Sequence, residues 1–368
     1  MKIGIITLPL HFNYGGILQN YALQKILKDM GHDPYTIEFQ DTFNTPYNPI
    51  VYIKRMLKKY ILRKNVKIFT EKYDRLTYPT ITQYTKTFIN NHIKRICYKD
   101  YKQIKPDDFG AFIIGSDQIW RPCYFPKLHI SYLGFARNWN IKKIAYAPSF
   151  GSDQWEYTFS QTRRCKNNLK HFTAVSIREK EGVKLCEQNL ERVPELVLDP
   201  TLLVGADIYS SLLDNYKCNE RIGMFTYVLD ENSWTKGFCK SIAQNKALPV
   251  YRANSKVEDP SAPLNERIQP SVEQWLYGIK NSEIVITDSF HACVFSIIFH
   301  KPFVVIVNKF RGVSRIKSLL EPLGLSKHII TEAGDFDANY DYSIPDSAYI
   351  KLASLKEPSL KYLLNSLK

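Results

Sequence analysis

The sequence predicts an α/β protein of about two domains. Short apolar runs alternate with amphipathic segments along most of the 368 residues, and this alternation is typical of parallel sheets covered by helices. At roughly 150 residues per domain, the length favours two domains. The hydrophobic content of 44% and the charged content of 23% are ordinary for a globular protein. No apolar run approaches the roughly 20 residues that span a bilayer.

The first half of the chain contains six predicted strands. Each is a short run of β-branched and other apolar residues followed by turn-forming or polar residues. The strands are Lys2–Thr7, Pro34–Phe39, Ala111–Ile114, Lys143–Ala147, Ala174–Ile177 and Leu196–Leu198. Helices are predicted at Ile17–Met30, which ends at Gly31, and at Glu181–Asn189. These elements define a first domain at residues 1–205.

A second alternation follows a polar stretch at Gly205–Glu220, which we expect to be an irregular link. The alternation predicts a second domain at residues 220–345. Residues 346–368 should form one or two helices that pack back on the first domain. The predicted strands are Ile222–Leu229, Pro249–Arg252, Ile284–Thr287 and Phe303–Val307, and the helices are Ser233–Asn245, Ser271–Asn281, His291–Phe299, Ser314–Leu323 and Tyr349–Leu367.

Residues 41–107 do not follow the alternation, and we expect a basic helical insertion there. No acidic residue occurs between Thr42 and Thr70. One predicted helix in residues 53–64 has an apolar face opposite a basic face, and it could lie on an anionic membrane surface. A core-packed helix with a solvated basic face has the same pattern and is more common. The apolar positions are Ile53, Met56, Leu57, Tyr60 and Ile61.

The net charge of +14 favours acidic partners, which include nucleic acids, anionic lipids and phosphorylated metabolites. A non-catalytic protein that binds RNA or acidic glycans is one interpretation, supported by the 24 tyrosines. No nucleic-acid-binding module is recognisable, so we expect no nucleic-acid partner. The N-terminal residues run directly into a strand pattern rather than a signal peptide, and we therefore expect a cytoplasmic protein.

The seven cysteines are scattered and include no C-x-x-C pair. This pattern argues against a disulfide framework and against a structural zinc site, and we expect no metal and no cofactor. Cys293 lies two residues after His291, so it is a possible nucleophile. A cysteine in an apolar helix is more often a core residue.

The segment Thr287–His291 lies between a predicted buried strand and a predicted buried helix. In an open α/β sheet, this strand-to-helix corner is where ligands bind. The first N–H groups of the helix favour an anion, and an imidazole among them suggests proton transfer beside a phosphate or carboxylate. Alternatively, Ser289 only caps the helix and His291 makes a local hydrogen bond.

Polar residues follow four other strands, and the carboxyl ends of parallel strands meet at one edge of a sheet. Gly15 and Gly16 allow close backbone approach at a helix start. Asp117 could accept a hydroxyl proton, or it could cap a helix with Ser116. Arg178 could grip an anion, or it could form a salt bridge with nearby Glu179 or Glu181. The segment Arg311–Arg315 again suggests anion recognition. Neither the G-x-G-x-x-G fingerprint nor a P-loop is present.

Several short motifs together resemble one enzyme family. They are Ile5–Pro9 with Asn13–Asn20, Phe112–Trp120, Ser176–Glu179, Leu198–Pro200, Ile286–His291 and Arg311–Arg315. Their order and spacing are similar to those of the polysaccharide pyruvyl transferase family. The resemblance implies two Rossmann-like domains facing across a cleft, similar to the GT-B glycosyltransferases. A GT-B glycosyltransferase that uses a nucleotide-sugar donor is the alternative interpretation.

The resemblance also implies a reaction. Phosphoenolpyruvate would be the co-substrate, and its pyruvyl group would form a cyclic ketal with two hydroxyls of one sugar while phosphate is released. The acceptor would be a glycan for a capsule, exopolysaccharide or cell-wall polymer. Such acceptors are often lipid-linked, and one containing galactose is a candidate. A lipid-linked acceptor would keep the protein at the inner face of the cell membrane, in peripheral contact through residues 53–64.

By the same resemblance, His291 would be the principal acid/base, Arg178 a phosphoenolpyruvate clamp, and Asp117 a base or orienter for the acceptor hydroxyl. Many family members carry Arg at the position of Ser289, two residues before the histidine. We expect Arg311 or Arg315 to replace that missing contact. The remaining candidate substrate-binding residues are Asn13, Tyr14, Gly15, Gly16, Gln19, Ser116, Gln118, Phe290 and Ser314.

Overall fold

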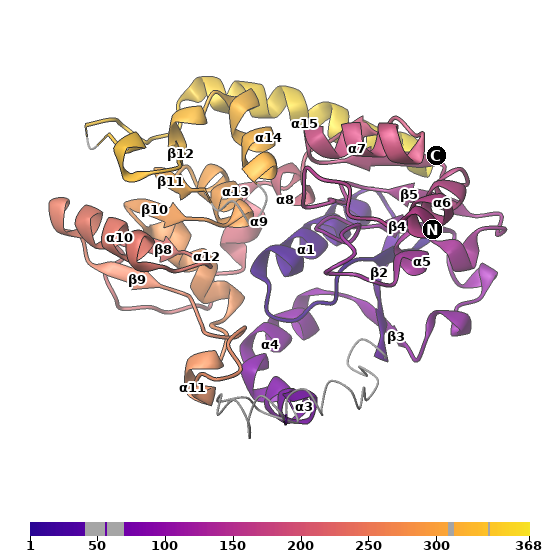
Figure 1. The fold of residues 1–368 in the computed structure, drawn as a ribbon, viewed down its shortest axis with the longest axis horizontal. Coiled ribbons are helices and arrows are strands. Elements are labelled where there is room, and N and C mark those ends of the chain that lie inside the picture. The colour runs from indigo at the N-terminus through magenta and orange to yellow at the C-terminus, as the bar shows by residue number, and fades with distance from the viewer. Residues whose placement is uncertain (41–55, 57–69, 308–312, 338) are drawn as a thin grey trace.

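The computed structural model describes residues 1–40, 56, 70–307, 313–337 and 339–368. Its described residues form two parallel sheets, each flanked by helices (Figure 1). The α/β prediction with two Rossmann-like units is thereby confirmed. The helix predicted within residues 53–64 lies outside the described residues, apart from Met56, and so does Arg311.

The first sheet has seven described strands in the order β3-β2-β1-β4-β5-β6-β7, and all its pairings are parallel. The strand order reverses between β1 and β4. The loops that leave these two strands therefore diverge and open a crevice. The bounds are β1 Lys2–Ile6, β2 Asp33–Phe39, β3 Arg95–Tyr98, β4 Ala111–Ile114, β5 Lys142–Ala145, β6 Ala174–Ile177 and β7 Glu195–Leu196.

The second sheet has five described strands in the order β12-β11-β10-β8-β9, also parallel throughout. Its order reverses between β8 and β10, which creates a second crevice at the carboxyl ends of those strands. The bounds are β8 Met224–Tyr227, β9 Val250–Arg252, β10 Ile284–Thr287, β11 Phe303–Ile306 and β12 Ile329–Ile330.

The helices cover the sheet faces and join the two halves (Figure 1). In the first half they are α1 Tyr14–Asp29, α3 Thr70–Ile81, α4 Gln83–His92, α5 Leu128–Ser131, α6 Phe159–Leu169, α7 Lys180–Leu190, α8 Pro200–Leu203 and α9 Ala206–Ser211. In the second half they are α10 Ser233–Asn245, α11 Leu264–Arg267, α12 Val272–Asn281, α13 Phe290–Ile298, α14 Val313–Leu323 and α15 Asp346–Leu367.

One hydrophobic core runs through both halves, because Ile17 of α1 and Phe295 of α13 belong to the same buried cluster. The C-terminal helix α15 reinforces this connection. The Tyr349 hydroxyl donates to the Ile297 carbonyl in the second half, at 3.3 Å. The Tyr362 hydroxyl donates to the Ala145 carbonyl in the first half, at 3.0 Å. The helix therefore spans the two halves and fixes them side by side.

The structure differs from the sequence prediction in several elements, and it adds some that were not predicted, among them α6 and β12. Residues 41–107 are not only helical, because they contain β3, the edge strand of the first sheet. Helix α1 begins at Tyr14 rather than Ile17, since the Asn13 side chain caps it by accepting from the Gly16 N–H. The link at 205–220 contains α9, whose Tyr209 is buried. At the C-terminus, where one or two helices were predicted, the structure has one, which includes Pro358.

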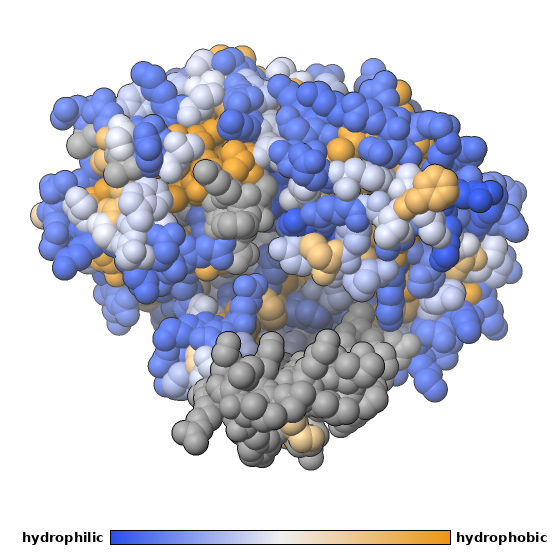
Figure 2. Space-filling view, viewed as in Figure 1, coloured by the Kyte–Doolittle hydropathy of each residue, from blue (hydrophilic) through white to orange (hydrophobic). Residues whose placement is uncertain are grey.

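The face seen in Figure 2 is mostly hydrophilic, and its apolar residues form separate patches. No described helix has the length and apolar content that a membrane span requires.

Candidate active site

His291 lies where the two halves meet. It is the second residue of α13 and directly faces the start of α1, with only 7% of the residue exposed. A Cβ atom placed on Gly15 would lie 1.9 Å from His291 Nδ1, and one on Gly16 would lie 3.3 Å from Asp117 Oδ2. Glycine at position 15 therefore admits the imidazole against α1. The sequence predicted that the backbone at Gly15 and Gly16 would be closely approached, and in the structure the groups that approach it are the side chains of His291 and Asp117.

Asp199 is the centre of a buried hydrogen-bond network. It precedes α8, and its Oδ2 accepts from Arg178 Nη1 at 2.5 Å and from Ser116 Oγ at 2.8 Å. Its Oδ1 accepts from the backbone and hydroxyl of Thr201. The same Oδ2 lies 3.7 Å from His291 Nε2, a separation that suits an ion pair but is too long for a hydrogen bond.

The surroundings of Asp199 keep its carboxylate charged. Burial opposes ionisation, but the neighbouring His291, Arg178 and Thr201 together hold the pKa of Asp199 well below its usual value. A charged and fully hydrogen-bonded carboxylate is a fixed electrostatic partner for the imidazole. Asp199 thus places a fixed negative charge of the first half opposite His291 of the second half.

Arg178 is buried among three carboxylates. In addition to Asp199, its Nη2 lies 3.4 Å from Asp117 Oδ1 and its Nε lies 3.8 Å from Glu179 Oε2. Burial opposes the charge of Arg178, but these carboxylates raise its pKa. Of the two glutamates considered as alternative partners, the structure pairs Arg178 with Glu179. Its shortest contact is nevertheless with Asp199.

The backbone at Asp117 has a conformation that is uncommon for a residue with a side chain. Its φ of 76° lies in the left-handed region, which costs about 1–3 kcal/mol when it is not glycine. The Asp117 carbonyl accepts from the Ser149 N–H at 2.8 Å, and this bond holds the turn. Strain of this kind is concentrated at functional sites. Neither Ser116 nor Asp117 caps a helix, since Ser116 bonds Asp199 and Arg178 instead.

Two guanidinium groups lie against the ring of Phe290. The Arg178 Cζ is 4.9 Å from the ring centroid and the Arg315 Cζ is 5.9 Å from it. Burial, together with the nearby charge of Arg178, lowers the pKa of Arg315 to about 10. Arg315 is still protonated at neutral pH. An anion placed between these cations and the imidazole would relieve their repulsion.

A cavity of about 710 Å³ lies between the two halves, and its lining includes Gly15, which faces His291. Asn13, Tyr14 and Gly15 line it from the first half, and Ser289 lines it from the corner after β10. The cavity lies at the crevice expected from the strand order of the second sheet, because residues that follow β8 and β10 line it. Other residues of the second half complete the wall, among them Tyr227, Leu229, Glu231, Lys236, Arg252 and Asn254.

Four polar atoms in this centre are buried and lack a hydrogen-bond partner among the described residues. They are His291 Nε2, Asp117 Oδ2, Glu179 Oε2 and Arg178 Nε. Buried polar groups are normally satisfied, and unpaired ones mark strain or a ligand site. One donor, two acceptors and one ring nitrogen at the same place provide binding capacity for a polar ligand.

Several of the predicted substrate-binding residues contact other parts of the protein and support the framework of the site. The Tyr14 hydroxyl donates to the Pro270 carbonyl at 2.8 Å, and its ring stacks on Trp275, so Tyr14 joins the two halves. Gln19 is fully buried, and its amide donates to Thr7 Oγ1 and to the Gly16 carbonyl. Gln118 packs against Gly151, where a Cβ atom would lie 1.9 Å from its Oε1.

Two further predicted residues lie at helix starts. Ser289 is the N-cap residue of α13, but its side chain makes no capping bond. Its backbone N–H donates to Thr287 Oγ1 at 3.0 Å. The simple capping interpretation of Ser289 is therefore wrong. Ser314 lies in the first turn of α14 and is partly exposed.

Cys293 is a core residue. It is fully buried in α13, and burial raises the pKa of its thiol far above the usual value, so a nucleophilic thiolate is disfavoured. The described residues contain no group of three or more His, Cys, Asp or Glu side chains that could hold a metal ion.

Sequence reasoning gave no role to Asp199 and considered Glu179 only as a salt-bridge partner of Arg178, although both belong to the motifs noted above. The sequence signal next to Asp199 is Pro200, because proline is common at the first position of a helix. That pattern indicates capping, which Asp199 does perform. Its contact with Arg178 and His291 is a long-range feature that no local pattern encodes.

Comparisons with known proteins show which family and which solved structures this chain is similar to. A family model described as polysaccharide pyruvyl transferase matches residues 13–309. A UDP-GlcNAc 2-epimerase from Neisseria meningitidis bound to UDP-GlcNAc aligns at 7% sequence identity. The alignment covers 98% of this chain and 94% of the epimerase chain, with a TM-score of 0.47. A putative UDP-N-acetylglucosamine 2-epimerase from Listeria monocytogenes aligns at 7% identity, 100% and 91% coverage, and a TM-score of 0.48.

Arabidopsis thaliana UGT89C1 complexed with UDP aligns at 11% identity, 99% and 93% coverage, and a TM-score of 0.44. No curated protein sequence gave a significant match. The family match covers the motifs from Asn13 to beyond His291, and the family description indicates a transferase that acts on polysaccharide. The chain belongs to the polysaccharide pyruvyl transferase family.

Proposed function

We propose that this protein transfers the pyruvyl group of phosphoenolpyruvate to two hydroxyls of one sugar in a glycan. The observation that carries the proposal is the cluster of His291, Asp199, Asp117, Arg178 and Arg315 at the junction of the two halves. An acid/base group and two arginines at one place suit a substrate with a phosphate, a carboxylate and a carbon to be protonated.

The reaction needs one proton delivered and two removed. His291 in its imidazolium form protonates the methylene carbon of phosphoenolpyruvate, which leaves an oxocarbenium-like centre on the adjacent carbon. The first sugar hydroxyl attacks that carbon and loses its proton to a base. The second hydroxyl then attacks the same carbon, the bond to the phosphate oxygen breaks, and its proton leaves with phosphate. The products are the ketal and inorganic phosphate.

The residues of the cluster divide these tasks. Asp199 orients the imidazole and balances its charge when His291 is protonated. Asp117 accepts the hydroxyl proton, since its Oδ2 has no hydrogen-bond partner among the described residues. Arg315 contributes the main anion contact, because three carboxylates already surround Arg178. Arg178 then holds those carboxylates in place and offers Nε to the donor.

This arrangement also addresses the missing arginine at position 289. Arg315 lies over the ring of Phe290, the residue next to Ser289. Its guanidinium can therefore occupy the space that an arginine at position 289 would fill. The substrate enters through the 710 Å³ cavity, which reaches Gly15 and Ser289. Because His291 Nε2 is buried, the two halves must part slightly for the donor to reach it.

The test is phosphate release from phosphoenolpyruvate in the presence of a glycan acceptor. The wild-type protein should release phosphate only when both substrates are present. His291→Gln should lower kcat by about 100- to 10,000-fold. His300→Gln, an exposed histidine outside the cluster, is the matched control and should behave as wild type. Phosphate release that does not depend on the acceptor, or an active His291→Gln variant, would contradict the proposal.

A lipid-linked acceptor assembled at the inner face of the membrane suits the net charge of +14, since each basic residue near an anionic surface contributes about 1 kcal/mol. Co-sedimentation with anionic vesicles at low salt, reversed at high salt, would support this part of the proposal. Its absence would argue for a free glycan acceptor.

A further inference from the structure

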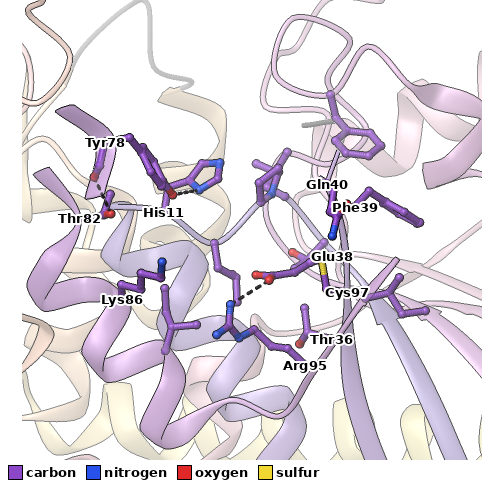
Figure 3. Close-up of a pocket in the computed structure, with 17 residues that line it drawn as sticks. His11, Thr36, Glu38, Phe39, Gln40, Tyr78, Thr82, Lys86, Arg95 and Cys97 are labelled. Atoms are coloured by element: carbon purple, nitrogen blue, oxygen red, sulfur yellow. Dashed lines mark hydrogen bonds and ion pairs between the residues drawn. The ribbon is translucent and has the colours of Figure 1, made fainter. Parts of the chain in front are cut away.

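We propose that a second pocket in the first half, drawn in Figure 3, binds a sugar ring of the acceptor glycan. The role of acceptor site rests on the proposed function, whereas the binding of a sugar does not. The pocket lies at the carboxyl ends of β1 and β2, beside the edge strand β3, and is flanked by α3 and α4. We call it the β1–β3 pocket. Its polar lining includes His11, Glu38, Tyr78, Lys86 and Arg95.

The size and walls of the pocket suit a small polar ring with apolar faces. Its volume is about 290 Å³, at the lower end of the roughly 300–1,000 Å³ typical of ligand pockets. Buried apolar side chains form part of the wall, among them Phe39 and Ile89. Sugars present C–H faces that pack on apolar and aromatic groups and hydroxyls that both donate and accept hydrogen bonds.

Polar groups of both kinds face the pocket. Arg95 Nη1 donates to Glu38 Oε2 at 2.8 Å, and Tyr78 is hydrogen-bonded to His11 Nδ1. In Figure 3 the Glu38 and Arg95 side chains point toward each other while Lys86 extends from α4 into the same space. A carboxylate, a guanidinium, an ammonium and a phenol together offer the donors and acceptors that sugar hydroxyls need.

The charge balance of the pocket disfavours the phosphoenolpyruvate donor. Burial lowers the pKa of His11 to about 4, so its imidazole is neutral at physiological pH. The carboxylate of Glu38 offsets the charge of Arg95. Lys86 is then the main uncompensated cation in the lining. One lysine offers few contacts to a donor that carries both a phosphate and a carboxylate, whereas its ammonium can donate hydrogen bonds to sugar hydroxyls.

One loop connects the pocket to the His291 centre. Leu8, Leu10 and His11 line the pocket, while the end of the same loop leads into Gly15, which faces His291. The Thr7 hydroxyl also lines the pocket and donates to the carbonyl of Ser116, next to Asp117. From α4, the Thr85 hydroxyl donates to the His11 carbonyl. A glycan seated in the pocket therefore contacts the loop that ends at the start of α1, where Gly15 faces His291.

Saturation-transfer NMR with methyl glycosides of glucose, galactose, mannose and N-acetylglucosamine tests the site. At least one glycoside should receive saturation from the wild-type protein. Glu38→Ala should reduce that transfer at least fivefold, and so should Lys86→Met, a second variant on an exposed position of α4 that does not depend on the Glu38–Arg95 pair. Arg164→Gln, which removes a cation from α6 near a different cavity, is the control and should leave transfer unchanged.

Calorimetric titration with phosphoenolpyruvate separates the two proposals. The Glu38 and Lys86 variants should bind phosphoenolpyruvate within twofold of wild type. Transfer to no glycoside, or transfer that survives both pocket variants and is lost in His291→Gln, would overturn the β1–β3 site. A protein that binds glycosides in this pocket but neither binds phosphoenolpyruvate nor releases phosphate would retain the sugar site and overturn the proposed reaction.

Discussion

His291 Nε2 and Asp199 Oδ2 lie 3.7 Å apart, although the two residues follow strands of different sheets. His291 follows β10 in the second half, and Asp199 follows β7 in the first. The candidate site therefore exists only while the two halves are in contact. The shared core and the hydrogen bonds of α15 to both halves maintain that contact.

The close packing of Gly15 against His291 leads to the first prediction. Gly15→Ala places a methyl group 1.9 Å from Nδ1, so the imidazole must move. A displacement of this kind should lower kcat about 100-fold, because roughly 1 Å of misplacement is sufficient for such a loss. Steady-state kinetics of phosphate release measures the effect.

Gly237→Ala is the matched control, since a Cβ atom at Gly237 meets nothing within 4 Å. It lies inside α10 and should retain activity while stabilising the helix by roughly 0.5–1 kcal/mol. Equal activities of the two alanine variants would contradict the packing argument.

Asp199→Asn should impair catalysis by removing the charge that faces His291. We expect kcat to fall about 10- to 100-fold, less than for loss of the imidazole itself, because Asp199 acts through His291. A positioning role also shifts the pH dependence of kcat, which a purely structural defect would not do. The pH–rate profile of the variant, compared with that of exposed Asp214→Asn, checks this. A profile of unchanged shape would argue against an electrostatic role.

The acid stability of the protein should depend on Asp199. Its pKa is far below the usual value in the folded state. The charged carboxylate therefore stabilises the fold at pH values above the unfolded pKa of about 4, and this contribution is lost as the pH falls below that value. The melting temperature of the wild type should begin to fall below about pH 5 and should fall most steeply below about pH 4.

Asp199→Asn should melt at a lower temperature near neutral pH, because breaking a buried ion pair costs about 3–5 kcal/mol. Its melting temperature should also change less with acid than that of the wild type. Calorimetric scans across this pH range measure both effects. A variant that follows the wild-type acid dependence would show that other carboxylates dominate.

Arg315 should determine affinity for the donor. Arg315→Ala should raise the KM for phosphoenolpyruvate about 10- to 100-fold, since a hydrogen bond to a charged group contributes roughly 1.5–3 kcal/mol. Arg315→Lys should give an intermediate KM, because lysine keeps the charge without the two-pronged geometry. The KM should also rise as the pH approaches about 10, where burial and Arg178 allow Arg315 to lose its proton. An unaltered KM in the alanine variant would mean that Arg315 does not bind the donor. The missing contact would then come from Arg311 or from neither arginine.

Local patterns predicted most strands and helices, because alternating burial and turn residues act over a few positions. They missed β3, a four-residue edge strand whose burial is incomplete, and they placed the start of α1 after the glycines. In both cases local propensity was weak, and tertiary contacts decided the outcome. The edge strand is held by pairing with β2, and the helix start is held by the Asn13 cap.

By itself, the sequence determined that polar residues follow several buried strands and that their motifs resemble one family. Only the tertiary structure decided which of those residues meet. Asp199 and Glu179 surround Arg178, Gly15 faces His291, and Tyr14 and Gln19 support the framework. The physical reason is that strand and helix formation depends on neighbouring residues, whereas charge pairing and close packing depend on distance in space. That distance is set by the way in which the two sheets and α15 pack together.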